Sequence, residues 1–151
     1  MAIEVVDRGG GETLWAGPIR YRILEDGTHT GHRIGMLEVT LPPRTAGTPD
    51  HVHREHDETL FVVSGTPTFT SGDSTITAQP GTLVTLPRGT PHSFANPGEE
   101  PVVILCTVAP DLIIGCFREL ANLRPGPTGL DTTEVAEVMA RYATEVVRPA
   151  V

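Results

Sequence analysis

The sequence predicts an all-β fold, a sandwich or a barrel, followed by a helical C-terminal extension. Gly occurs 16 times and Pro 14 times, and both fall between short runs rich in Val, Ile, Leu, Thr and aromatic residues. Such punctuation is typical of many short strands joined by turns. The apolar spacing changes to a helical period only after Asp111. We expect one domain, because 151 residues match the size of a single core.

Nine segments have the composition of strands, with β-branched and aromatic residues enriched. They cover residues 14–16, 19–24, 33–41, 58–65, 66–72, 74–78, 82–87, 91–95 and 102–108. The sequence SGDST lies between the fifth and sixth segments, and it predicts a hairpin with Gly72 and Asp73 at its tip. Many strands at short, regular spacing indicate a sandwich or barrel.

The last forty residues predict one or two helices. In DLIIGCFREL, the apolar residues that can share one helical face are Ile113, Phe117 and Leu120. After RPGPTG, Asp131 can cap a second helix, and Glu134 can complete a capping box. Apolar residues then recur at helical spacing at Val135, Val138, Met139, Tyr142 and Val146. We expect this stripe to pack on the outside of the β core, as a lid or an oligomer contact.

The charge of the chain argues against two classes of partner. The chain has eleven Arg, no Lys and nineteen Asp plus Glu, for a formal net charge of -8. Nucleic acids and anionic membranes bind clustered positive charge, so we expect a small-molecule partner instead. The N-terminus lacks the pattern of a secretory signal, and no apolar run approaches the about 20 residues of a membrane span. We therefore expect a cytoplasmic protein, in which Cys106 and Cys116 are buried, reduced thiols.

The segment DHVHREHDETL, residues 50–60, concentrates three of the six histidines and four carboxylates. His51 and His53 are two positions apart, so both imidazoles point to the same face of a strand. Glu58 has the wrong parity for one unbroken strand, and it can join the two histidines only if the chain bends before it. The intervening polar residues REHD suit such a break.

A second stretch, GTLVTLPRGTPHSFAN at residues 81–96, carries His92 after a Pro-Arg-Gly turn. With His92 added, three imidazoles and one carboxylate would form a site for a divalent transition metal: Fe, Mn, Ni, Cu or Zn. The donor set does not choose among these metals. Four protein ligands leave positions for water, oxygen or substrate on a metal that prefers five or six ligands.

Other polar residues compete for a role at this site. His56 falls inside the expected break, where its side chain would face solvent, and it is a candidate to contact a ligand rather than the metal. His29 and His32 have the context of surface-loop residues. Glu38 could point into the barrel as an acid or base, although an exposed position is more common for Glu.

The two stretches together resemble the cupin superfamily. Its motifs read G-x5-H-x-H-x3,4-E-x6-G and G-x5-P-x-G-x2-H-x3-N. The chain matches the first motif from its first histidine over residues 51–65, and Thr45 replaces the leading glycine, with Gly47 two positions later. It matches the second motif at Gly81, Pro87, Gly89, His92 and Asn96. The resemblance covers about residues 31–109, and the tail is similar to that of small bacterial quercetinase-like cupins.

The resemblance implies a double-stranded β-helix, the cupin jelly-roll barrel, as one domain over residues 1–151. The core barrel would span about 31–109 and the helical extension 110–151. The resemblance also implies that one metal near the barrel centre is bound by His51, His53, Glu58 and His92. Asn96 would be a turn or strand-end residue. In quercetinase-like cupins the metal-bound Glu is thought to accept the proton of the substrate hydroxyl, so Glu58 is the expected catalytic residue.

The leading functional hypothesis is a metal-dependent oxygenase, a dioxygenase that acts on a small aromatic or enolic compound of flavonol or polyketide type. One alternative is a metal-dependent cyclase or isomerase, and another is a non-catalytic ligand-binding protein. Similar cupins are commonly dimers, so we expect a homodimer that uses the N-terminal strands or the final helix as its contact.

Overall fold

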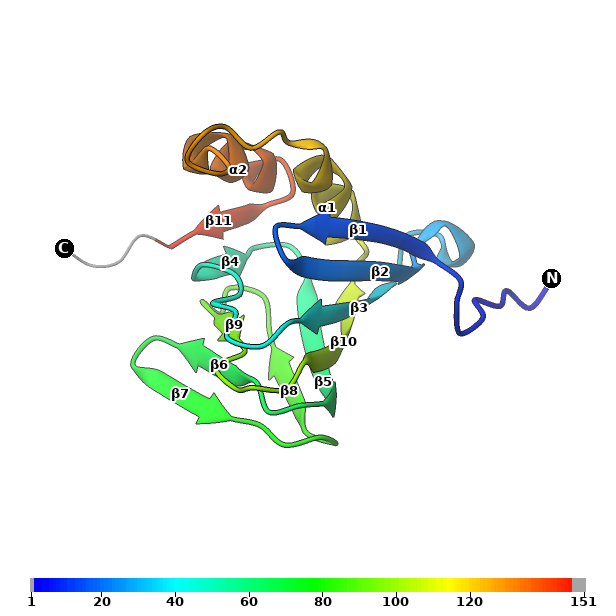
Figure 1. The fold of residues 1–151 in the computed structure, drawn as a ribbon. Helices are drawn as coiled ribbons and strands as arrows, with labels where there is room; N and C mark the ends of the chain where they lie inside the picture. The colour runs from blue at the N-terminus through cyan, green and yellow to red at the C-terminus, as the bar shows by residue number, and fades with distance from the viewer. Residues whose placement is uncertain (1, 148–151) are drawn as a thin grey trace.

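Three antiparallel sheets surround one apolar core in the computed structural model, counted over residues 2–147, which are the residues it describes (Figure 1). The six-stranded sheet contains, in order, β1 (Glu12–Ala16), β2 (Ile19–Glu25), β3 (Gly35–Leu41), β10 (Val102–Ala109), β5 (Asp57–Ser64) and β8 (Leu83–Leu86). The three-stranded sheet contains β7 (Ser74–Thr77), β6 (Thr68–Ser71) and β9 (Ser93–Ala95). The two-stranded sheet contains β11 (Thr144–Val146) and β4 (His51–His53).

The all-β fold predicted from the sequence is confirmed, and the sheets are consistent with a jelly roll. Each of the nine predicted segments contains a strand, and β6 and β7 join in the predicted hairpin at Gly72 and Asp73. Strands β3 and β10 alternate between buried and half-buried residues along their whole length. Every second residue of these strands therefore points to the core, as a strand period of two requires.

The entry into β4 depends on a glycine. Gly47 has a φ of 72°, and a Cβ at this position would overlap the backbone carbonyl oxygen of Phe94. Only glycine fits both the left-handed backbone and this close approach. The glycine that the motif places at the position of Thr45 is thus found two residues later, at Gly47.

Asn96 closes the same corner of the barrel. Its side-chain nitrogen donates to the backbone oxygens of Leu41, Pro42 and Glu100, and its oxygen accepts from the amide of Gly98. The side chain is buried, and its bonds join the turn after β9 to the end of β3. Asn96 is therefore a structural residue at a strand end, as expected.

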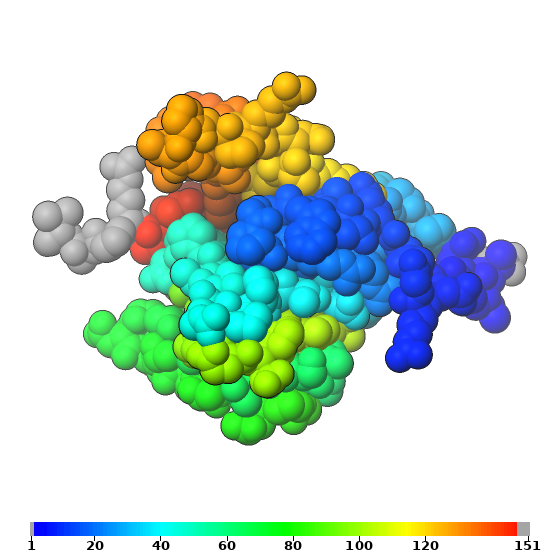
Figure 2. All heavy atoms as spheres, in the orientation of Figure 1, coloured from blue at the N-terminus to red at the C-terminus, as the bar shows by residue number. Residues whose placement is uncertain are grey.

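Two helices and a strand of the C-terminal segment cover one side of the barrel. Helix α1 (Ile113–Asn122) and helix α2 (Thr132–Ala140) lie against each other above β1 and β11 (Figure 1). Figure 2 shows the spheres of the helical segment resting on those of the N-terminal strands. Asp131 caps α2, because its side chain accepts hydrogen bonds from the backbone amides of Thr133 and Glu134. No helix between residues 2 and 147 is long and apolar enough to cross a membrane.

The predicted second helix was too long. It ends at Ala140, and the segment Thr144–Val146 forms strand β11 instead of a further helical turn. Ala143 has a φ of 50°, which ends the helical path, and β11 then pairs with β4. Pairing with a neighbouring strand outweighs the weak helical pattern of β-branched residues. Residues 148–151 of the predicted extension lie outside the described residues.

Candidate metal centre

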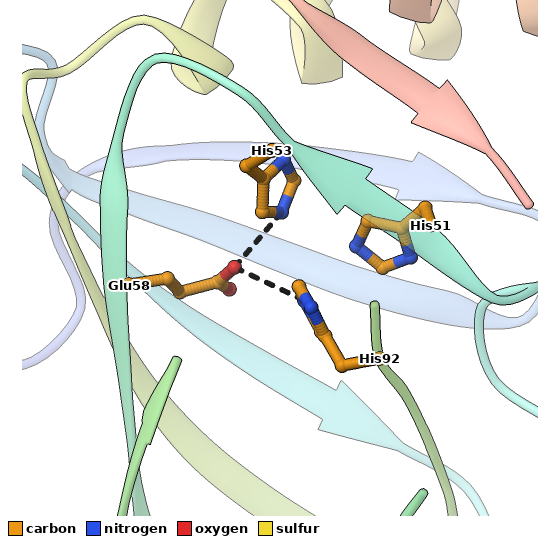
Figure 3. A group of neighbouring side chains, drawn as sticks. All are labelled: His51, His53, Glu58 and His92. Carbon is orange, nitrogen blue, oxygen red and sulfur yellow. Dashed lines mark ion pairs between the residues drawn. The ribbon is translucent and has the colours of Figure 1, made fainter. Parts of the chain in front are cut away.

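Four side chains from three separate segments converge inside the barrel (Figure 3). They are His51 and His53 of β4, Glu58 of β5, and His92 just before β9. One potential ligand atom from each lies within 4.8 Å of the others. The Nε2 atoms of His53 and His92 lie 2.9 Å and 3.4 Å from Oε2 of Glu58. The structure therefore brings together all four residues that the sequence selects.

The backbone explains how these residues meet. His51 and His53 share a face of β4, and the chain bends before β5 begins, so that Glu58 turns toward them. His92 faces His51 across a pair of backbone hydrogen bonds, with N···O distances of 3.0 Å and 2.9 Å. The expected break in the REHD segment is thus confirmed, and it corrects the parity of Glu58.

Each of the three histidines has its Nδ1 atom engaged on the side away from the cluster. Nδ1 of His51 lies 2.8 Å from the Pro49 carbonyl oxygen, and Nδ1 of His92 lies 2.9 Å from that of Thr90. A carbonyl oxygen only accepts hydrogen bonds, so these Nδ1 atoms carry the hydrogen. In the neutral ring, the electron pair of Nε2 then faces the cluster. Such bonds orient metal-binding histidines in proteins.

The side chains of the cluster differ in their charge at neutral pH. Burial opposes ionisation of Glu58, but hydrogen bonds from His53 and His92 hold its pKa well below the usual value. Burial also opposes the charged form of His92, yet the nearby Glu58 carboxylate raises the pKa of His92. Burial, followed by the neighbouring His92 and His53, lowers the pKa of His51 to about 4. At neutral pH the cluster therefore combines an anionic carboxylate with at least one neutral imidazole.

The donor set fits a divalent transition metal. Nε2 of His92 is buried and has no hydrogen-bond partner within residues 2–147 that satisfies normal geometry. Oε2 of Glu58, which faces His53 and His92, also lacks such a partner. A metal bound here would use these atoms, and its binding would displace any proton that they hold. Three imidazoles and a carboxylate suit several metals, so the identity of the metal stays open.

A cavity of about 350 Å³ opens beside the cluster. His51, His53 and Glu58 form part of its wall, and apolar side chains from the barrel and the C-terminal helices form most of the rest. Representative apolar residues are Ile19, Leu37 and Phe94 from the barrel, and Phe117, Val135 and Met139 from the helices. Two residues of the predicted stripe, Val135 and Met139, thus line the cavity, and whether the segment acts as a lid or as an oligomer contact stays a prediction.

Sequence reasoning missed four polar residues that line this cavity: Tyr21, Thr48, Cys106 and Thr144. The Sγ atom of Cys106 donates to Oε1 of Glu58 at 3.1 Å, and Oγ1 of Thr144 lies 2.9 Å from Nδ1 of His53. Tyr21 and Cys106 occupy inward positions of β2 and β10, so strand alternation could have placed them inside the barrel. Nothing in the sequence pairs Thr144 with His53.

The expected exposure of His56 was wrong, whereas its expected contact with a ligand residue agrees with its position beside His53. Its side chain is fully buried, and neither ring nitrogen has a hydrogen-bond partner among the described residues. The ring lies against His53, with centroids 4.1 Å apart, on a bend whose sequence is otherwise polar. Contact with His53 therefore buries an imidazole that polarity alone would place in solvent.

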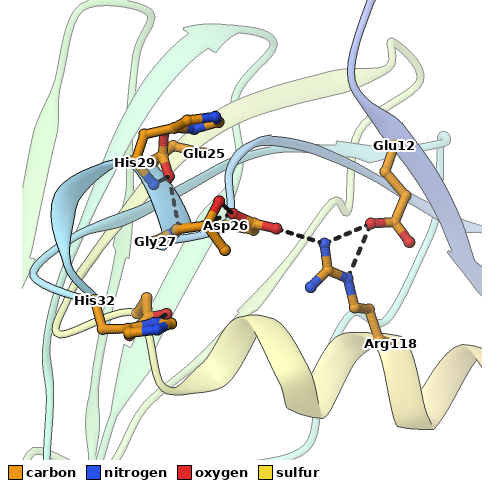
Figure 4. Close-up of polar contacts among 9 residues, drawn as sticks. Glu12, Glu25, Asp26, Gly27, His29, His32 and Arg118 are labelled. Atoms are coloured by element: carbon orange, nitrogen blue, oxygen red, sulfur yellow. Dashed lines mark hydrogen bonds and ion pairs between the residues drawn. The ribbon is translucent and has the colours of Figure 1, made fainter. Parts of the chain in front are cut away.

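The other polar candidates lie away from the cavity. Glu38 pairs with Arg20 and Arg22 on the outer face of the sheet, so it does not point into the barrel. His29 and His32 are exposed, as expected (Figure 4).

One further group of possible ligands consists of Glu25, Asp26 and His29. Its oxygens are occupied by local hydrogen bonds: Glu25 accepts from the amide of Gly27 and lies 2.9 Å from Nδ1 of His29. Asp26 accepts from Thr28 and from Arg118 of α1. Figure 4 shows these contacts: those within residues 25–29 hold the turn after β2, and the one between Asp26 and Arg118 joins this turn to α1. We assign this group a structural role.

A comparison against protein-family models matches the part of the chain that carries the four clustered residues. Residues 37–108 match the cupin domain family. The chain is similar to the cupin domain family over this segment. This match runs from the third residue of β3 to the next-to-last residue of β10, and it includes all four residues of the cluster. The C-terminal helices and β11 lie outside the matched cupin domain.

Solved structures of other proteins share this fold. A sugar phosphate isomerase from a cupin superfamily of Silicibacter pomeroyi is 21% identical, with 70% of this chain and 75% of that chain covered and a TM-score of 0.60. KdgF from Halomonas sp. is 20% identical, with 72% of this chain and 94% of that chain covered and a TM-score of 0.63. The polyketide cyclase RemF from Streptomyces resistomycificus is 23% identical, with 72% of this chain and 80% of that chain covered and a TM-score of 0.62. At these identities the likeness shows the cupin fold alone. No curated protein matches the sequence.

Proposed function

We propose that this protein is a metal-dependent enzyme, a dioxygenase that acts on a small aromatic or enolic compound. The observation that carries the proposal is the buried group of three histidines and one glutamate, which opens onto an apolar cavity. A metal held by His51, His53, Glu58 and His92 would supply a Lewis acid with positions left for oxygen or a chelating substrate. The resemblance to quercetinase-like cupins adds the dioxygenase class to this proposal.

Glu58 has the central role in the proposed chemistry. Its low pKa keeps the carboxylate ionised at neutral pH, and the thiol of Cys106 holds one of its two oxygens. The other oxygen faces the histidines. A substrate hydroxyl in the cavity could lose its proton to this carboxylate, which makes Glu58 the proposed proton acceptor.

The lining of the cavity supports a neutral, largely apolar substrate. Among the described residues that line the cavity, Glu58 is the one carboxylate, and none is an Arg. Any other charge in the lining would come from a protonated histidine of the cluster. A phosphorylated sugar would leave its anionic group beside apolar walls, which is unfavourable. Aromatic or enolic compounds with few polar groups match this lining better than the sugar phosphates named for one structural neighbour.

A cyclase is the second candidate. One solved structure of the same fold is a polyketide cyclase, and a polyketide would also suit an apolar cavity with a few polar groups. In that case the metal would polarise a carbonyl group, and oxygen would not be consumed. A binding protein without catalysis is a third outcome.

The proposal includes a cytoplasmic homodimer whose partner is a small molecule. The acidic net charge of -8 supports the absence of a nucleic-acid or membrane partner. Light scattering on the purified protein tests the dimer, and a mass of about one chain would contradict it.

Metal analysis tests the centre itself. Protein purified without chelators should contain about one metal ion per chain, and His92→Ala should lose it. His32→Ala is the matched control, because His32 is an exposed histidine far from the cavity. Wild-type protein that holds no metal, and whose stability does not change with a chelator, would refute the proposed enzyme.

Oxygen consumption then separates the two reaction classes. A dioxygenase should take up one O₂ for each flavonol, catechol or polyketide enol converted, and it should stop under anaerobic conditions. A cyclase should convert its substrate at the same rate without oxygen. Turnover that is independent of oxygen would therefore reject the dioxygenase and support the second candidate.

A further inference from the structure

We propose that Thr144, in strand β11, is a positioning residue for the metal ligand His53. Its hydroxyl group would hold the ring so that Nε2 presents its electron pair to the metal. This inference rests on the proposed metal centre. It deepens that proposal because it assigns part of the site to the C-terminal segment, outside the matched cupin domain.

The hydrogen-bond geometry around Thr144 suits a metal-bound His53. The Thr144 hydroxyl donates its only hydrogen to the backbone oxygen of Tyr142 at 3.1 Å. The same oxygen lies 2.9 Å from Nδ1 of His53, and Nε2 of that ring lies on the side of Glu58. When Nε2 gives its electron pair to a metal, Nδ1 carries the hydrogen of the ring, and the Thr144 oxygen accepts it. Thr144 is fully buried, so water does not compete for these bonds.

His53 differs from the other two ligands in the origin of this support. His51 and His92 each bond to a backbone oxygen two residues earlier in the chain, and no side chain is needed. His53 bonds to a side chain 91 residues later. Backbone carbonyls survive any substitution at their own position, but a hydroxyl can be removed. The orientation of His53 is therefore the one that a single substitution can test.

The strand that carries Thr144 is held by contacts that do not involve this hydroxyl. Thr144 and His53 are direct partners in the β11–β4 pair. Backbone bonds of 2.8 Å flank the pair, from Arg54 to Ala143 and from Val147 to Asp50. Removal of the hydroxyl should therefore leave β11 in place, since the pairing is made by the backbone.

A contact with α1 adds to this anchoring. The ring of Tyr142 packs so closely on Gly115 of α1 that a Cβ there would come within 2.7 Å of it. This contact fixes the turn before β11 and with it the carbonyl that receives the Thr144 hydrogen. The position of the hydroxyl is thus determined by the packing of the whole C-terminal segment on the barrel.

The test compares Thr144→Val with Thr144→Ser and uses Co²⁺ as the probe. Val has the shape of Thr without the hydroxyl, whereas Ser keeps the hydroxyl. Co²⁺ affinity is measured by competition with a chelating dye at 25 °C. Circular dichroism at the same temperature confirms that each variant is folded. The visible spectrum of bound Co²⁺ reports the ligand geometry. Thr75→Val is the matched control, because it removes a hydroxyl bonded to Thr70 in the distant β6–β7 hairpin.

We expect Thr144→Val to weaken Co²⁺ binding by about 10- to 100-fold and to change the spectrum, as loss of such supporting bonds does at other metal sites. Thr144→Ser should restore affinity to within about threefold of wild type, and Thr75→Val should not change it. Equal affinity for Thr144→Val and wild type, or equal losses for Val and Ser, would overturn the role of Thr144 alone. Failure of wild-type protein to bind Co²⁺ would instead overturn the metal centre, and the inference with it.

Discussion

The Sγ atom of Cys106 lies 3.1 Å from Oε1 of Glu58 and donates a hydrogen bond to it. Strand β10 pairs with β5 here, and Cys106 is buried among the apolar residues that line the cavity. A thiol next to a carboxylate cannot easily lose its own proton, because two negative charges would then face each other in an apolar environment. The thiol therefore serves the carboxylate as a donor.

We predict that neither thiol of the native protein reacts with a thiol reagent at pH 8. Burial and the Glu58 carboxylate raise the pKa of Cys106 well above the usual value, and burial raises that of Cys116 to about 12. The reactive thiolate is thus rare. The reagent should label two thiols per chain after unfolding in urea and none before it. Rapid labelling of native Cys116→Ser protein, which retains only Cys106, would contradict this prediction.

The buried imidazole of His56 predicts a loss of stability in acid. Burial, followed by the neighbouring His53, lowers the pKa of His56 from 6.5 to about 4. Between these values the unfolded chain binds the proton and the folded chain does not, so the free energy of unfolding falls as the pH decreases from 6.5 to 4. The shift corresponds to about 3 kcal/mol, and the loss is complete only near the lower value.

His56→Leu should remove this pH dependence. Leu has a similar volume and no polar atoms to leave unpaired, so the metal-free variant should be more stable than wild type, with a gap that widens from pH 7 to pH 4.5. Urea unfolding at several pH values measures this gap. His32→Leu is the control with the opposite sign, because its bond to Asp111 raises the pKa of His32. A gap that stays constant with pH would show that His56 does not titrate as expected.

Spacing could predict the ligands but not their support. His51 and His53 are recognisable because strand alternation puts them on one face, and His92 because a turn precedes it at the motif spacing. Thr144 was not predictable, because the apolar residues around it continue a helical period. Only the pairing of β11 with β4, set by the folded chain, brings it to His53.

His56 was misjudged for a related reason. The segment REHD is polar, and polarity predicts exposure for a bend. In the fold, however, the ring of His56 packs against the ring of His53 and is buried. Side-chain contacts between residues near in sequence but separated by a bend depend on the path of the backbone, which the composition of four residues does not define. The strand pattern was enough to predict an all-β sandwich or barrel, and the two motifs added the jelly roll through the resemblance that they carry.

The N-cap of α2 should be measurable as stability. The Asp131 carboxylate accepts hydrogen bonds of 2.8 Å and 3.2 Å from two amides that the helix cannot satisfy itself. Asp131→Ala should lower the free energy of unfolding by about 1 kcal/mol, a decrease of about 2–4 °C in Tm for a chain of this size. Asp131→Asn should retain most of the stability, since Asn also caps well. Thermal denaturation followed by circular dichroism compares the three proteins, and equal values for Ala and Asn would contradict the cap.

Tyr21 supplies the remaining prediction about the cavity. Its ring packs on Phe117 with centroids 4.5 Å apart, and its side chain lines the cavity near Glu58. Burial, together with the nearby Cys106 and Glu58, raises the pKa of the phenol, so the hydroxyl keeps its hydrogen at neutral pH. We therefore expect the hydroxyl to donate a hydrogen bond to a polar group of the bound substrate.

Tyr21→Phe should lower kcat/KM by about 5- to 10-fold for a hydroxylated or carbonyl substrate, the value of one neutral hydrogen bond. Stability should hardly change, because the ring contact with Phe117 is retained. Tyr142→Phe is the matched control, because Tyr142 does not line the cavity and its hydroxyl lies near Glu119 instead; kcat/KM should stay at the wild-type value. If both variants kept wild-type kcat/KM, the Tyr21 hydroxyl would not contact the substrate, and the cavity would recognise its ligand by shape and by the metal cluster alone.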